Sequence, residues 1–223
     1  MAEGTMTKAV FLDLDNTLYR YGECNTAALK KVMQFLSGRC GISLKKAHVL
    51  FGDSRKGVKK RLRDTASSHS RLLYFKALVE KATGKTDPRL CLAAEELFWR
   101  EYLKRMMLLP EARRFLGYCR KRRKKIIIIT DLTAQIQLRK ILRLGITNSV
   151  DRVITSEEMG KDKPHPSLYR AALQYAGCRP SEAIMIGDNI EKDVRGAQRL
   201  KIRVFSSFER ARRMLESEMK REC

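Results

Sequence analysis

Short apolar runs recur along the chain, and segments whose apolar residues have helical spacing separate most of them. The strands expected from these runs lie at 8–13, 126–129, 152–155, 183–186 and 202–205. Continuous apolar runs of this length are typical of strands that are buried on both faces, and strands that alternate with helices predict a parallel sheet. The sequence therefore predicts an α/β fold in which helices cover a parallel sheet.

A long helical stretch interrupts this alternation after the first run. Residues 19–107 contain no convincing buried strand, and their apolar residues recur at helical spacing. Turn-forming residues divide the stretch into segments: Gly38, Gly41, Gly52, Gly84 and Pro88. We therefore predict two domains, an α/β core made of residues 1–18 and 108–223 and an all-helical domain made of residues 19–107.

Two acidic residues, Asp13 and Asp15, stand at the end of the first apolar run. Side chains two positions apart in an extended chain point the same way, so we expect both carboxylates near one point at the carboxyl end of the strand. Two carboxylates in such a place are costly to hold without a cation or a proton between them. An ordinary turn capped by an Asp is the alternative explanation.

Polar residues also follow the second and fourth apolar runs. Thr130 and Asp131 follow the second run, Asp188 follows the fourth, and Lys163 lies on a loop that could return to the same edge of the sheet. In open parallel sheets the functional groups lie beyond the carboxyl ends of the strands. Acids, a hydroxyl and a lysine gathered there would suit a metal ion and a phosphate group.

These four groups of residues, in this order, resemble the motifs of the haloacid dehalogenase superfamily of phosphohydrolases. The matching segments are Asp13-Leu14-Asp15-Asn16-Thr17-Leu18, Ile129-Thr130-Asp131, Lys163-Pro164-His165-Pro166 and Ile186-Gly187-Asp188-Asn189-Ile190-Glu191-Lys192-Asp193-Val194-Arg195-Gly196-Ala197. The resemblance covers residues 8–18 and about 108–205. It implies a Rossmann-like core, and the helical insert between the first and second motifs resembles the superfamily's helical cap domain.

The resemblance implies a phosphatase that works through an aspartyl-phosphate. Asp13 would be the nucleophile, and Asp15 would be the general acid for the leaving alcohol and then the base for water. Thr130, Asp131 and Lys163 would form the substrate phosphate site, with Lys163 offsetting the negative charge. True dehalogenases of the superfamily lack an Asp at the position of Asp15, so its presence favours phosphate transfer to water.

The resemblance also implies Mg²⁺ as the cofactor, because this hard ion prefers oxygen ligands. Asp13, Asp188 and the backbone carbonyl of Asp15 would hold the ion. Asp193 would support the metal, either as a ligand or through the groups around it.

Several of these assignments have alternatives that the sequence leaves open. Lys161 is a rival for the role of Lys163, which we prefer because Pro164 follows it directly. Asp188 could cap a helix, and Asp193 could be an exposed acid on that helix. Asp131 stands where Asn is frequent in the superfamily, which adds a negative charge near the phosphate.

The chain is strongly basic, with 47 Lys and Arg against 25 Asp and Glu and a formal net charge of +22. Residues 19–107 are its more basic part, with 20 Lys and Arg against 8 Asp and Glu. A solvated basic surface is the plain explanation, but such charge also attracts multiply anionic molecules. We expect a small phosphorylated metabolite as substrate, from the sugar phosphates or the nucleotides. The alternative is a protein that binds nucleic acid or processes its ends on the same scaffold.

The cysteines and the apolar runs bear on the compartment of the protein. The six cysteines are scattered without a metal-binding pair, so we expect reduced thiols in a cytoplasmic protein. No secretory signal is recognisable, and no apolar run is long enough to cross a bilayer, so no membrane partner is expected. The sequence does not indicate an oligomeric state.

Overall fold

The computed structural model describes residues 6–220 of the chain. The chain divides into two compact units. One unit comprises the residues up to Arg20 and from Met107 onward, and the other comprises Tyr21–Met106. That these units are a catalytic core domain and a cap domain stays a prediction.

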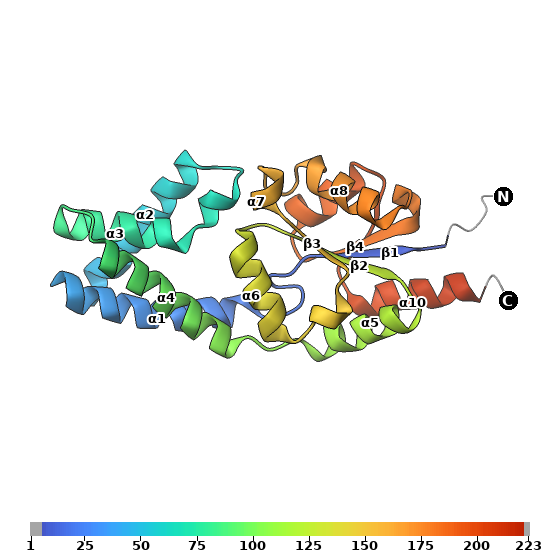
Figure 1. The fold of residues 1–223 in the computed structure, drawn as a ribbon, viewed down its shortest axis with the longest axis horizontal. Helices are drawn as coiled ribbons and strands as arrows, with labels where there is room; N and C mark the ends of the chain where they lie inside the picture. Colours follow the sequence, from blue (N-terminus) through green and yellow to red (C-terminus); the bar gives the residue numbers. More distant parts are fainter. Residues whose placement is uncertain (1–5, 221–223) are drawn as a thin grey trace. The chain divides into compact units, whose positions relative to one another are not determined.

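The first unit is built on a parallel five-stranded sheet with the strand order β3-β2-β1-β4-β5 (Figure 1). The strands are β1 (Ala9–Leu12), β2 (Lys125–Thr130), β3 (Arg152–Thr155), β4 (Ala183–Ile186) and β5 (Arg203–Phe205). The central strand β1 pairs in parallel with β2 and with β4, and Ala9 lies opposite both Lys125 and Ala183. The predicted α/β fold with a parallel sheet is confirmed.

Helices cover both faces of this sheet. They are α5 (Pro110–Lys121), α6 (Ala134–Leu144), α7 (Ser156–Met159), α8 (Pro166–Ala176), α9 (Arg195–Gln198) and α10 (Phe208–Met219), with the short turns η2 (Thr147–Ser149), η3 (Pro180–Glu182) and η4 (Ile190–Val194). Figure 1 shows α8 on one face of the sheet and α5 and α10 on the other. With both faces covered, the central strands β1 and β4 are apolar and buried at every position.

Burial of the strands follows from this layering. All four side chains of β1 are buried, and β2 exposes only Lys125 at its start. On the α8 face, Leu168 and Tyr169 pack into the same apolar cluster as Phe11 of β1 and Ile127 of β2. The site at the carboxyl ends of β1, β2 and β4 therefore stands on a packed core.

The second unit is helical and consists of α1 (Tyr21–Cys40), α2 (Leu44–Arg61), η1 (Ala66–His69), α3 (Arg71–Thr83) and α4 (Pro88–Arg105). Aromatic side chains fill its interior. The ring centroid of Phe98 lies 5.8 Å from that of Phe75 and 4.9 Å from that of Trp99. The helical spacing of the apolar residues predicted helices in this segment, and each helix turns one apolar face toward the others.

Two properties concern the described residues as a whole. Within residues 6–220, none of the helices combines the length and the apolar character needed to cross a membrane. Cys24, Cys40, Cys91, Cys119 and Cys178 are free thiols.

Candidate active site

Asp13 follows β1 directly and is buried among charged groups. Its backbone amide donates to the carbonyl oxygen of Ile186 at 2.9 Å, which ties it to the end of β4. Its Oδ1 accepts a hydrogen bond from Lys163 Nζ at 2.6 Å, and its Oδ2 accepts one from the Thr17 hydroxyl at 3.1 Å. Burial raises the pKa of Asp13 to about 7 against the opposing effect of the Lys163 ammonium, and the charge of Asp193 raises it further. The effect of burial on Asp13 therefore outweighs that of its ion pair with Lys163.

Asp188 and Asp193 bring two more carboxylates to Asp13. One oxygen from each of the three groups lies within 4.8 Å of the others. Burial raises the pKa of Asp188, although a hydrogen bond with Asn16 lowers it. Three carboxylates with a surplus of negative charge are the hard oxygen donors that Mg²⁺ prefers, so the residues present fit this ion.

Lys163 bridges two of these carboxylates. Its Nζ donates to Asp13 and to Asp193, each at 2.6 Å, and its side chain is buried. Burial alone would lower the pKa of Lys163, but the carboxylates of Asp13 and Asp193 outweigh burial and hold it well above its usual value. Lys161 is exposed, so the geometry favours Lys163 of the two candidates.

The segment after β4 positions Asp193. The Asn189 amide donates to Asp193 Oδ2 at 3.1 Å. A helix is expected from about residue 190 to residue 200, and the structure has the π-helical turn η4 followed by the short helix α9. π-helical turns are frequent at functional sites. Asp193 is buried in this turn, which excludes the alternative that it is an exposed helix acid.

Asp15 has partners of its own. Lys140 Nζ donates to both of its carboxylate oxygens, at 2.7 and 2.8 Å, and the Tyr19 hydroxyl donates to its Oδ1 at 2.5 Å. The two acids are near enough for Asp15 to raise the pKa of Asp13. Lys163 contacts Asp13, whereas Lys140 contacts Asp15. The expectation of one shared point assumed an extended backbone, whereas β1 ends at Leu12 and Asn16 has a left-handed φ of 67°. A metal contact through the backbone carbonyl of Asp15 stays a prediction.

Thr130 ends β2 with its side chain buried. Gln137 on α6 donates to Thr130 Oγ1 at 2.6 Å and to the carbonyl oxygen of Asp131 at 2.6 Å. Because Gln137 is the donor, Thr130 keeps its hydroxyl proton, which makes a long hydrogen bond of 3.3 Å to the carbonyl of Asp131. Leu132 has a φ of 95°, a strained conformation of the kind that clusters at functional sites.

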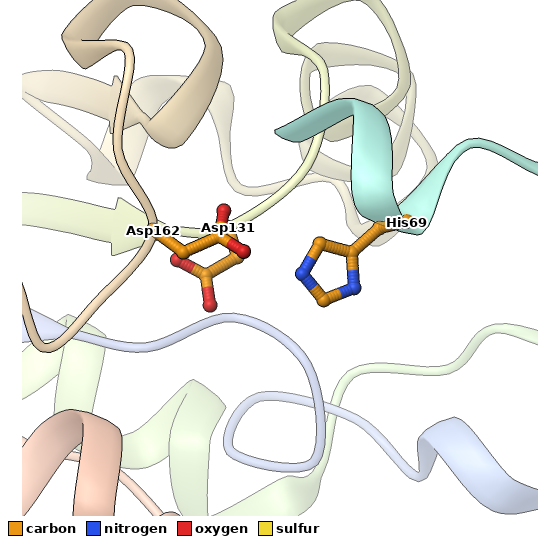
Figure 2. A group of neighbouring side chains, drawn as sticks. All are labelled: His69, Asp131 and Asp162. Carbon is orange, nitrogen blue, oxygen red and sulfur yellow. The ribbon is translucent and has the colours of Figure 1, made fainter. Parts of the chain in front are cut away.

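Asp131 contacts protein groups on both carboxylate oxygens. It accepts from the backbone amide of Lys163 at 2.8 Å and from Lys192 Nζ at 2.5 Å. Figure 2 shows its carboxylate beside that of Asp162. Asp131 therefore orders the loop that carries Lys163, and its contact with substrate stays a prediction.

Sequence reasoning missed four residues that contact the predicted site: Tyr19, Gln137, Lys140 and Lys192. Gln137 and Lys140 are three positions apart and so share one face of α6. That spacing was a usable signal, but polar residues in a helix ordinarily face water.

Comparison with known proteins gives consistent matches over most of the chain. A family model described as a haloacid dehalogenase-like hydrolase matches residues 7–201. The ribulose-1,5-bisphosphate 5-phosphatase of Halopiger xanaduensis is 40% identical over 196 residues, which are 86% of this chain and 81% of that protein. The glyceraldehyde 3-phosphate phosphatase of Methanocaldococcus jannaschii is 28% identical over 195 residues, 87% of this chain and 82% of that protein. The crystal structure of a HAD phosphatase from Thermococcus onnurineus superposes with a TM-score of 0.72 at 27% identity, covering 89% of this chain and 85% of that one.

Proposed function

The chain belongs to the haloacid dehalogenase-like hydrolase family and is a phosphatase of that family, and we propose that it hydrolyses sugar phosphates through an aspartyl-phosphate on Asp13. The observation that carries the proposal is the position of the Asp13 carboxylate. It lies at the end of the central strand, bound by Lys163, with carboxylate oxygens of Asp188 and Asp193 within 4.8 Å. This is where a nucleophile, a divalent ion and a phosphate group can meet.

The chemistry needs two steps. In the first, a carboxylate oxygen of Asp13 attacks phosphorus, the bond from phosphorus to the sugar oxygen breaks, and Asp15 gives its proton to that oxygen. In the second, Asp15 takes a proton from water as the water oxygen attacks phosphorus. The bond between phosphorus and Asp13 then breaks, inorganic phosphate leaves, and both side chains return to their starting states.

The surrounding groups stabilise the charge on phosphate. Lys163 offsets part of the repulsion between the phosphate and the carboxylates. The Thr130 hydroxyl, oriented by Gln137, donates a hydrogen bond to a phosphoryl oxygen. Asp13, Asp188 and Asp193 would hold Mg²⁺, which when bound screens the carboxylates from the phosphate.

A sugar with two phosphate groups suits the chain better than a sugar with one. The formal net charge of +22 favours substrates with more negative charge, and the relative from Halopiger is named for a bisphosphate. We expect a higher kcat/KM for ribulose 1,5-bisphosphate than for glyceraldehyde 3-phosphate.

The test is phosphate release from these two sugars and from a nucleoside monophosphate, with Mg²⁺ and with a chelator. Wild type should release phosphate only with the metal, and Asp13→Asn should lower kcat by on the order of 10⁴-fold or more. The matched control is Asp53→Asn, because Asp53 is an exposed acid on α2, and it should behave as wild type. Hydrolysis of neither sugar, or an Asp13→Asn variant as active as wild type, would contradict the proposal.

A further inference from the structure

Lys140 is a buried cation that the proposed chemistry does not use. Its side chain is 1% exposed, and its ammonium contacts both carboxylate oxygens of Asp15. Lysine is rarely buried, because removing an ammonium from water costs more than one ion pair ordinarily returns. Stability alone is therefore a poor explanation for a lysine in this place.

The orientation of α6 supports a specific role for this lysine. Leu138 and Leu142 of this helix are 50% and 67% exposed, whereas Gln137 and Lys140 are buried. Gln137 reaches Thr130, and Lys140 reaches Asp15. The helix thus buries two polar side chains while it exposes two leucines, a break with the usual pattern that is expected at functional sites.

Separate partners hold the two acids of the first motif. Lys163 and Thr17 bind Asp13, whereas Lys140 and Tyr19 bind Asp15. A change at Lys140 therefore alters the surroundings of Asp15 and leaves both of these contacts to Asp13 in place.

We propose that Lys140 is a positioning residue that holds the Asp15 carboxylate in the orientation needed for both proton transfers. This inference rests on the proposed function, in which Asp15 gives its proton to the sugar oxygen and later takes one from water. Each transfer needs an oxygen of Asp15 within hydrogen-bond reach of the reacting oxygen. The contacts of Lys140 with both oxygens restrict rotation of the Asp15 side chain, and the Tyr19 hydroxyl adds a third contact.

The experiment compares two leaving groups. A sugar alkoxide is a poor leaving group and needs the proton of Asp15, whereas 4-nitrophenolate leaves readily without one. Loss of general acid catalysis therefore lowers kcat/KM for the sugar phosphate more than for 4-nitrophenyl phosphate. The ratio kcat/KM reports the steps up to departure of the leaving group, so it omits the hydrolysis of the aspartyl-phosphate that both esters share. A merely structural role of Lys140 would lower both kcat/KM values by the same factor.

The variants are Lys140→Met and Lys140→Gln, and either one can provide the result if the other does not fold. Melting curves check the folding of each variant. For the sugar phosphate, kcat/KM should fall about 100-fold, within the range that general acid–base groups contribute. For 4-nitrophenyl phosphate, kcat/KM should fall less than about threefold. The matched control is Arg139→Met, which removes an exposed cation from the neighbouring position of α6 and should change neither rate.

Asp15→Asn shows how the enzyme behaves when the Asp15 carboxyl group itself is lost. It should show the same dependence of kcat/KM on the leaving group, and adding Lys140→Met to it should lower kcat/KM no further, because the lysine acts through Asp15. Equal losses of kcat/KM on both esters, or losses that multiply in the double variant, would overturn the inference. If wild type hydrolyses the sugar phosphate and Asp15→Asn depends on the leaving group, such a result rejects the role of Lys140 and leaves the proposed function standing.

Discussion

Gly187 lies against the carboxylate of Asp193 at the end of β4. A Cβ placed on Gly187 would lie 2.5 Å from both Cγ and Oδ2 of Asp193. Real Cβ atoms do not approach other atoms so closely, so any side chain at this position displaces Asp193. Since Asp193 contacts Lys163 at 2.6 Å, the displacement would reach the groups around Asp13.

We therefore expect Gly187→Ala to lower the free energy of unfolding by about 1–3 kcal/mol, which is typical of overpacking in a dense interior. Phosphatase activity should fall about tenfold or more, because the displaced Asp193 carboxylate no longer positions the Lys163 ammonium. Denaturant unfolding and phosphate release measure the two effects. The control is Gly117→Ala in α5, where a Cβ meets nothing within 4 Å. This change should raise the free energy of unfolding by up to about 1 kcal/mol, because alanine favours the helix over glycine. A Gly187→Ala protein that matches wild type in both measurements would contradict the predicted clash.

At the scale of single residues, the strand-end rule predicted part of the candidate site. Asp13 and Asp188 come together because parallel strands end at one edge of the sheet, and Lys163 reaches Asp13 from a loop that the sequence only allowed to return there. The rule could not predict how Asp15 is held, because that depends on where β1 ends and on a lysine 125 positions away. The spacing of Gln137 and Lys140 shows that they share a face of α6, but it does not identify partners so distant in sequence.

At the scale of secondary structure, α6 departs most from the expected pattern. Its apolar spacing suggests that Leu142 faces the core, yet this side chain is 67% exposed, while Ile141 is 5% exposed. We expect Leu142→Lys to change the free energy of unfolding by less than about 0.5 kcal/mol. Ile141→Ala should lower it by about 2–4 kcal/mol, because it removes buried methyl groups and leaves a cavity. Denaturant unfolding checks both, and a large loss in Leu142→Lys would mean that α6 is turned differently.

The five strands and the helices between them were predictable because each strand contains adjacent apolar residues, even where an exposed Lys125 or Arg152 begins the strand. Helix faces were less predictable, since Gln137 and Lys140 look like solvent-facing residues until their partners Thr130 and Asp15 are known. The π-helical turn η4 was also missed, because nothing in its composition distinguishes it from the start of an ordinary helix. These departures all lie at the predicted site, where local preference gives way to function.

At the scale of the whole molecule, the net charge of +22 has to be reconciled with a small substrate. A protein with this charge attracts any polyanion, whether or not it acts on it. Exposed cations on α2, among them Arg55, Lys56, Lys60 and Arg61, contribute to this field. Nucleic-acid binding alone therefore would not show that nucleic acid is the partner, and its dependence on salt is the informative quantity.

We expect the Asp13→Asn protein to bind a short single-stranded oligonucleotide at about 50 mM salt and to lose this binding near about 200 mM, because the attraction comes from counterion release. Fluorescence anisotropy at several salt concentrations measures the slope of log Kd against log salt. Replacing Lys56 and Lys60 together with Gln should reduce this slope by about one for each lysine that contacts a phosphate. Binding that stays tight near 200 mM would instead favour the alternative, a nucleic-acid-binding or end-processing protein, because contacts other than charge would then hold the strand. In that case an oligonucleotide with a terminal phosphate becomes the next substrate to compare with the sugar phosphates.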